Sequence, residues 1–194
     1  PANEFLNLEG EKFSTSKNWA IWLDDYMKDF PEMEDTLRYV LTANAPENKD
    51  NDFTWKDFQA KNNNELVAIF GNFINRVAVL TEKYYDGLTP QISAFNNEER
   101  NLLDEVYSYP EKIGKSLEKF KFREAVNKMI DLARIGNKYL ADQEPWKIIK
   151  TPNAEKVKTI MNISIQICGI LTLVCEPFLP NTSNKLKEQF NIIN

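Results

Sequence analysis

Apolar residues recur at helical spacing through most of the chain after residue 18. Between residues 54 and 85 they follow alternating steps of three and four, which predicts one long helix with a single apolar face. That face consists of Leu66, Phe70, Phe73, Val77, Leu80 and Tyr84. Three asparagines at 62–64 predict a bend within the helix, and Asp86-Gly87 predicts its end, because glycine readily takes the left-handed closing conformation.

The polar stretch 46–52 precedes this helix and predicts a linker. Before it, Phe5 to Gly10 has a strand-like pattern, and a loop follows. Two short helices are expected over 19–27 and 33–41. The chain therefore divides into a small linker subdomain, residues 1–52, and a helical domain, residues 53–194.

Three further helices are expected after the long one. Asn96 or Asn97 is expected to cap the first, which Pro110 breaks or kinks. The second carries an apolar stripe from Phe122 to Leu140, and the third begins at Asn153 and ends before Glu176. Four or five helices with short connections predict an all-α, antiparallel bundle.

Composition excludes several kinds of site. The chain of 194 residues contains no histidine, so the usual general base and the commonest zinc ligand are missing, and we predict no metal site. Cys168 and Cys175 lie on one helical face inside an apolar run, which favours two buried, reduced thiols and a cytoplasmic protein. That run contains polar residues and is shorter than a bilayer requires, so no membrane span is predicted. A net charge of −5 argues against indiscriminate binding of polyanions, DNA included.

The loop after the first strand carries candidate phosphate-binding chemistry. Ser14, Thr15 and Ser16 can donate hydrogen bonds to phosphate oxygens, and Lys12 and Lys17 flank them with positive charge. Such a group would suit a leaving pyrophosphate. Taken alone, the same residues also fit a solvated turn.

Three side chains could read an RNA base. Asn72 and Arg76 are four apart, so they project from the same stripe of the long helix, beside its apolar face. An amide and a guanidinium can together pair with the edge of one unstacked base. Trp146, which follows Pro145, could supply a stacking surface. A helix-surface pair and a packing tryptophan are the structural alternatives.

The segment Lys12 to Ser16, KFSTS, resembles the KMSKS loop of class I aminoacyl-tRNA synthetases, with Thr15 in place of the second lysine. The flanking Phe5 to Gly10 narrows the resemblance to methionyl-tRNA synthetases. Other stretches resemble the same family in the same order. They are Leu37-Arg38-Tyr39, Asn44 to Glu47, Asp52 to Trp55, Asn72 to Arg76, Lys83 to Gly87, Glu144 to Lys147 and Glu176 to Pro180.

This resemblance implies a part of a methionine–tRNA ligase. Lys12, Ser14, Thr15, Ser16 and Lys17 would then contribute to ATP-dependent methionine activation, with Mg as the metal of ATP. Asn72, Arg76 and Trp146 would bind the first base of the CAU anticodon of methionine tRNA. The catalytic domain, the methionine pocket and the zinc-binding insertion of the family would lie upstream, so the fragment alone is expected to be inactive. The alternatives are a free-standing tRNA-binding module and a helical scaffold without an RNA role.

Overall fold

One continuous helical run organises the molecule in the computed structural model, which describes residues 2–192. The run consists of α3 (Trp55–Lys61), the π-helical segment η2 (Asn62–Gly71) and α4 (Asn72–Tyr85). Residues at both junctions keep right-handed helical backbone angles, so the axis is not interrupted. At the three asparagines, where a bend was predicted, the structure has a change of helix type that begins at Asn62, a residue of low helix propensity.

Both ends of the run have a clear chemical cause. The Thr54 hydroxyl accepts a hydrogen bond from the backbone N–H of Asp57 at 3.1 Å and caps the start of α3. At the other end Asp86 and Gly87 both have positive φ, 51° and 76°, which closes α4. The predicted long helix and its predicted end are therefore confirmed.

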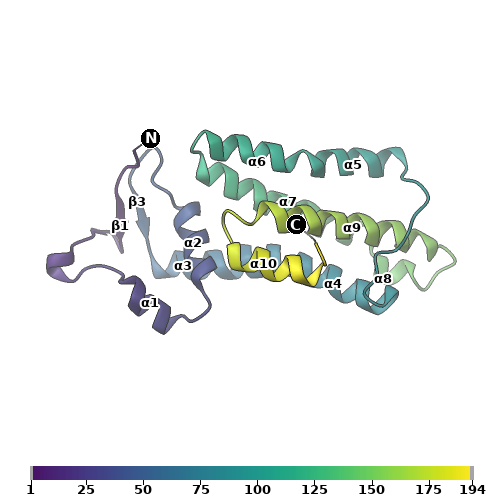
Figure 1. Cartoon of the computed structure of the whole chain (residues 1–194), viewed down its shortest axis with the longest axis horizontal. Coiled ribbons are helices and arrows are strands. Elements are labelled where there is room, and N and C mark those ends of the chain that lie inside the picture. The colour runs from purple at the N-terminus through teal and green to yellow at the C-terminus, as the bar shows by residue number, and fades with distance from the viewer. Residues whose placement is uncertain (1, 193–194) are drawn as a thin grey trace.

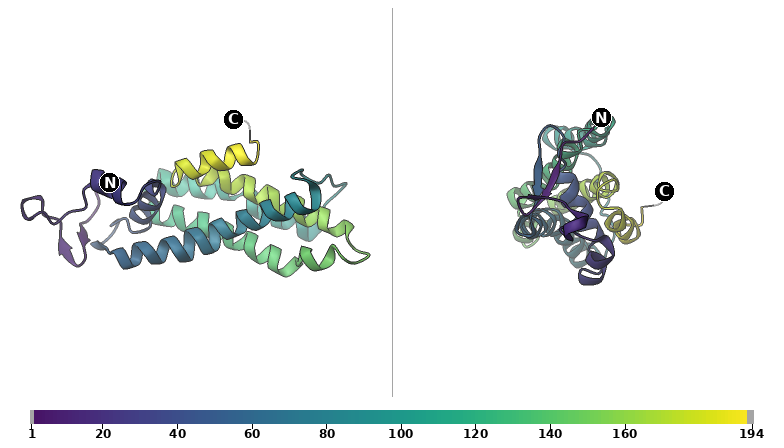
Figure 2. Two further views of the ribbon diagram at one scale, coloured as in Figure 1. Left: turned by 90° about the horizontal axis from the view of Figure 1, so that it is seen from below. Right: turned by 90° about the vertical axis from the view of Figure 1, so that its left-hand side faces the viewer.

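Within residues 2–192 five further helices complete the bundle, and a short one closes its far end (Figure 1). Their bounds are α5 (Asn97–Tyr107), α6 (Tyr109–Glu118), α7 (Phe122–Gln143), α8 (Pro145–Ile148), α9 (Glu155–Val174) and α10 (Pro180–Gln189). Two views of the molecule show a long bundle with its helices roughly parallel to one axis (Figure 2). The predicted all-α bundle is confirmed, whereas α8 and α10 were not expected from the sequence.

The start of α5 and the break after it follow the sequence signals. Asn96 caps α5 in a capping box with Glu99: each side chain accepts a hydrogen bond from the other residue's backbone N–H. The two helices are separated at Ser108, and Pro110 falls in the first turn of α6. Backbone N–H groups in a first turn have no partner within the helix, so a proline there costs no hydrogen bond.

Helix α9 forms the centre of the core and contacts α4, α5, α6, α7, α8 and α10. By length and composition it would also pass as a membrane span, but 56% of its most apolar window is buried by the rest of the bundle. Cys168 and Cys175 are free and buried in it or directly after it. Its high apolar content is thus explained by the helices packed around it.

The amino-terminal subdomain holds a three-stranded sheet in the order β2-β1-β3. The strands are β1 (Leu6–Leu8), β2 (Glu11–Lys12) and β3 (Asn51–Phe53), with β1 antiparallel to β2 and parallel to β3. A 3-10 turn, η1 (Thr15–Lys17), and two helices, α1 (Leu23–Asp29) and α2 (Glu34–Ala43), lie between β2 and β3.

Two expectations about this subdomain need correction. The first helix begins at Leu23, not at Trp19, because Trp19 pairs its backbone with Ser14 and donates its indole N–H to the carbonyl of Leu8 at 3.1 Å. The polar stretch 46–52 is not simply a linker, since its last two residues begin β3. The boundary at residue 52 stays a prediction, and β3 crosses it.

Two carboxylates join the subdomain to the bundle at the starts of helices. Asp35 on α2 accepts hydrogen bonds from the backbone N–H and the hydroxyl of Thr182, both at 2.7 Å, in the first turn of α10. Glu47 accepts from the backbone N–H of Arg123 at 2.8 Å, in the first turn of α7. Negative charge at a helix start is favourable, so both contacts stabilise the junction.

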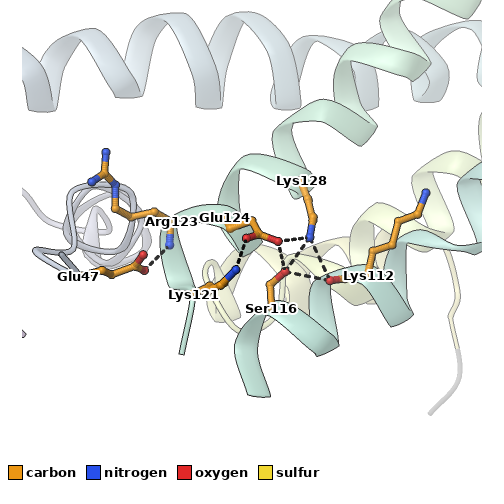
Figure 3. A network of polar contacts seen from close by, with 7 residues as sticks. All are labelled: Glu47, Lys112, Ser116, Lys121, Arg123, Glu124 and Lys128. Atoms are coloured by element: carbon orange, nitrogen blue, oxygen red, sulfur yellow. Dashed lines mark hydrogen bonds and ion pairs between the residues drawn. The ribbon is translucent and has the colours of Figure 1, made fainter. Parts of the chain in front are cut away.

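A second polar network fixes the start of α7 against α6 (Figure 3). Glu124 accepts hydrogen bonds from the ammonium of Lys128 and from the buried hydroxyl of Ser116, and it pairs with Lys121 at 3.4 Å. These donors, Lys128 first, lower the pKa of Glu124 to about 2. The start of α7 is thereby held against α6.

Candidate functional site

Asn72 and Arg76 lie one turn apart near the start of α4. The neighbouring Phe73 and Val77 are fully buried, which turns this stretch of the helix so that Asn72 is exposed and Arg76 partly exposed. The predicted common stripe is therefore present, and it is open to solvent.

Trp146 reaches the same surface from α8. Glu144 adopts a left-handed conformation, φ 43°, that ends α7, and Pro145 starts the next turn with its ring buried. Trp146 remains partly exposed, and the guanidinium carbon of Arg76 lies 5.0 Å from the centre of its ring. This is a cation–π contact, so the structure brings Arg76 and Trp146 together although 70 residues separate them in the chain.

Helix α7 contributes three polar residues that the sequence did not single out. Arg134, Asn137 and Lys138 line one side of an open depression of about 410 Å³, and Asn72 and Arg76 line the other. Ala68, Ile69 and Ala141 complete its lining. The spacing of the three, i, i+3 and i+4 on the helix that carries the stripe from Phe122 to Leu140, is the signal that could have found them. We call this depression the α4–α7 groove.

The charges of the groove leave one cation available. Arg134 pairs with Asp131 at 2.6 Å, and Lys138 pairs with Asp142. Arg76 forms no ion pair with any carboxylate of residues 2–192. Its guanidinium contacts the ring of Trp146, and this contact does not use its N–H donors. A ligand in the groove would therefore meet the donors of Arg76 directly.

The groove is held in shape by a close approach of α4 and α7. A Cβ atom on Gly136 would lie 2.4 Å from Cζ of the fully buried Phe73 ring. Only glycine allows this approach, and Phe73 and Gly136 directly neighbour Asn72 and Asn137. Between the latter two, the Asn72 side chain donates a hydrogen bond to Asn137 at 3.1 Å.

The KFSTS loop lies at the opposite end of the molecule from α8 (Figure 1). Glu9 and Gly10 both have positive φ in the turn from β1 to β2, and the N–H of Gly10 donates to the carboxylate of Asp52 at 2.9 Å. The turn η1 then exposes Thr15, Ser16 and Lys17.

The side chains of this loop are open to solvent, except that Ser14 is only partly exposed. The hydroxyls of Ser14 and Ser16 lie 3.3 Å apart, and the ammonium of Lys12 lies 5.5 Å from the centre of the Phe5 ring. Hydroxyl and ammonium donors so placed can bind phosphate oxygens. The structure does not bring them near Asn72, Arg76 or Trp146, so the two predicted sites are separate. Within the described part of the chain, no three acidic or cysteine side chains gather as a metal cage.

Comparison with known proteins identifies the family of the chain. A family profile described as tRNA synthetases class I (M) matches residues 1–78, and a profile for the anticodon binding domain of methionyl tRNA ligase matches residues 89–194, more than half of the chain. The whole chain is 61% identical to a methionine–tRNA ligase of Christiangramia forsetii, and 99% of it is 60% identical to that of Flavobacterium psychrophilum. It spans 28% of the length of each of these relatives.

Solved structures agree on the fold. A Mycobacterium tuberculosis methionyl-tRNA synthetase in complex with methionyl-adenylate matches 95% of this chain, and the chain covers 36% of it, with a TM-score of 0.85 at 22% sequence identity. Taken together, the two profiles and the relatives show that the chain belongs to the methionine–tRNA ligase family and contains its anticodon-binding domain.

Proposed function

We propose that this chain recognises the CAU anticodon of methionine tRNA as part of a methionine–tRNA ligase. The observation that carries the proposal is the meeting of an amide, a guanidinium and an indole, Asn72, Arg76 and Trp146, on one open surface of the bundle. Such a surface suits an unstacked base, which needs edge contacts and a flat partner.

Binding would rearrange Arg76. Its guanidinium now lies over the indole of Trp146, where a base would stack. A base that displaces the guanidinium from the ring gains about 1–3 kcal/mol of stacking and frees the N–H donors of Arg76 for its own edge. Specificity then follows from pairing, because a wrong base leaves buried polar groups without partners.

The KFSTS loop would serve the chemistry in the full-length ligase. In the proposed role, Lys12, Ser14, Ser16 and Lys17 bind the departing pyrophosphate of ATP, which carries Mg, and Thr15 adds a hydroxyl where the family has a second lysine. The exposed positions of Lys12, Thr15, Ser16 and Lys17 support this role. The ligase's own catalytic domain is then the partner of the amino-terminal end, and a cytoplasmic location follows.

A free-standing tRNA-binding module is the second candidate. The match of residues 1–78 to a class I synthetase profile favours the ligase instead, since a bundle reused for RNA binding alone would not need a nucleotide loop. A helical scaffold without an RNA role would not explain why the amide of Asn72 and the guanidinium of Arg76 face solvent in the groove.

Titration of anticodon stem-loops tests the proposal. The parent chain is expected to prefer a CAU loop over single-base variants, and Trp146→Ala is expected to weaken CAU binding about 5- to 150-fold, the equivalent of one lost stack. Trp22→Ala is the matched control, because Trp22 is an exposed indole, 46% accessible, in the amino-terminal subdomain. Equal affinity of Trp146→Ala and the parent for CAU would overturn the proposal.

The loop needs the full-length ligase. ATP–pyrophosphate exchange with methionine is expected to fall in Lys12→Ala and Lys17→Ala and to stay unchanged in Lys28→Ala, whose side chain pairs with Asp25 on α1. The 194-residue chain alone is expected to show no exchange. Unchanged exchange in both loop variants would remove the loop from the reaction.

A further inference from the structure

Both polar atoms of the Asn137 side chain on α7 form hydrogen bonds. Its nitrogen Nδ2 donates to two backbone carbonyls, that of Ile69 at 2.8 Å and that of Ala133 at 3.1 Å. Its oxygen Oδ1 accepts from the side chain of Asn72 at 3.1 Å. Asn137 thus links α7, the π-helical segment η2 and α4 at the floor of the α4–α7 groove.

These contacts determine the orientation of both amides. A backbone carbonyl can only accept, so the Asn137 atom that faces the carbonyls of Ile69 and Ala133 must be its nitrogen. The atom that faces Asn72 is then the oxygen, which can only accept. Asn72 must therefore turn its own nitrogen toward Asn137, and its oxygen Oδ1 points away from that contact.

An isolated asparagine could present either end to a ligand, because its amide can flip. Asn72 has lost that freedom, and it offers the groove an acceptor beside the N–H donors of Arg76. The complementary edge has an amino group beside a ring acceptor. Cytosine carries this pattern, whereas uracil and guanine place a carbonyl where the amino group would lie.

We propose that Asn137 is a positioning residue that fixes the amide of Asn72 with its oxygen toward the bound base, and so sets the preference for an amino-bearing base over a keto base. The inference rests on the proposed anticodon function and deepens it. The π-helical segment takes part, because the Ile69 carbonyl that orients Asn137 belongs to η2.

The test is a ratio of two affinities, measured with stem-loops whose anticodons are CAU and UAU. In the parent, CAU is expected to bind more tightly. Asn137→Ala removes the acceptor that holds Asn72, so the CAU-to-UAU affinity ratio is expected to fall about fivefold or more. Asn137→Asp keeps an acceptor toward Asn72 but replaces the donor to the carbonyls of Ile69 and Ala133 with a carboxylate oxygen, so the ratio is expected to fall in this variant as well.

A purely structural role would give a different result. It would lower both affinities by the same factor and leave the ratio unchanged, which would overturn the inference. Asn127→Ala, on an exposed position of the same helix, is the matched control for helix stability. A ratio that stays unchanged in Asn137→Asp would also overturn it, and a parent without preference for CAU would overturn the proposed function itself.

Discussion

Gly136→Ala is expected to disturb the groove by pushing α4 and α7 apart, without removing any side chain that would bind the base. The added Cβ would lie 2.4 Å from Cζ and 2.6 Å from two further carbons of the Phe73 ring, about 1 Å short of ordinary contact. Phe73 is fully buried and cannot swing away, so α7 and α4 must separate by a comparable amount. The neighbouring Asn72–Asn137 hydrogen bond, 3.1 Å long, would then stretch to about 4 Å and break.

Overpacking of this kind costs roughly 1–3 kcal/mol, whereas alanine in place of a helical glycine returns up to about 1 kcal/mol. Gly114→Ala on α6 meets no atom within 4 Å and isolates the second effect. We therefore expect Gly136→Ala to melt about 2–12 °C below Gly114→Ala in thermal unfolding, and to lose preference for CAU over UAU. Adding Phe73→Leu should return part of both losses. A Gly136→Ala variant as stable and as selective as Gly114→Ala would refute the reasoning.

Three other predictions concern the rest of the molecule. Glu124→Gln should lower the melting temperature at pH 7. The pKa of Glu124 in the folded protein is lowered to about 2 from an ordinary 4.5, so the stabilisation by its charge is lost as pH falls through that range. The melting temperatures of parent and variant should therefore become equal near pH 2. Asp35→Ala should lower the free energy of unfolding by about 1–3 kcal/mol in urea titrations, because it leaves the start of α10 without its acceptor; an unchanged midpoint would contradict this. Burial raises the pKa of the Cys168 thiol and that of Cys175, the latter to about 12, so neither should react with a thiol reagent at pH 8 until guanidinium is added.

The sequence predicted what depends on neighbouring residues. The cap at the start of α5 and the end of the long helix at Asp86-Gly87 arise from local chemistry, and both are present. At the three asparagines, where a bend was expected, the structure has a change of helix type. The apolar period likewise predicted the bundle, because the buried stripe of the long helix needs the same residues whatever packs against it.

What the sequence could not predict depends on distant residues. The start of α1 shifts because Trp19 bonds to Leu8 and Ser14, and β3 exists only through its pairing with β1. No sequence pattern singled out Asn137, because its proposed role depends on hydrogen bonds with the carbonyl of Ile69 and the amide of Asn72, which only the fold brings near it. The candidate roles of Asn72, Arg76 and Trp146 came from resemblance and stay predictions.

The part of the uninterrupted run from Trp55 to Asn72 acts as a spacer between the sheet and the groove, roughly 25 Å long at 1.5 Å per residue. Removing one residue from η2 would shorten this spacer by little more than a bond length. It would, however, rotate everything beyond by about 100°, and so carry Asn72 and Arg76 to another side of the bundle. Substitutions of side chains along the spacer are thus tolerated far more easily than insertions or deletions, which rotate the groove residues about the helix axis.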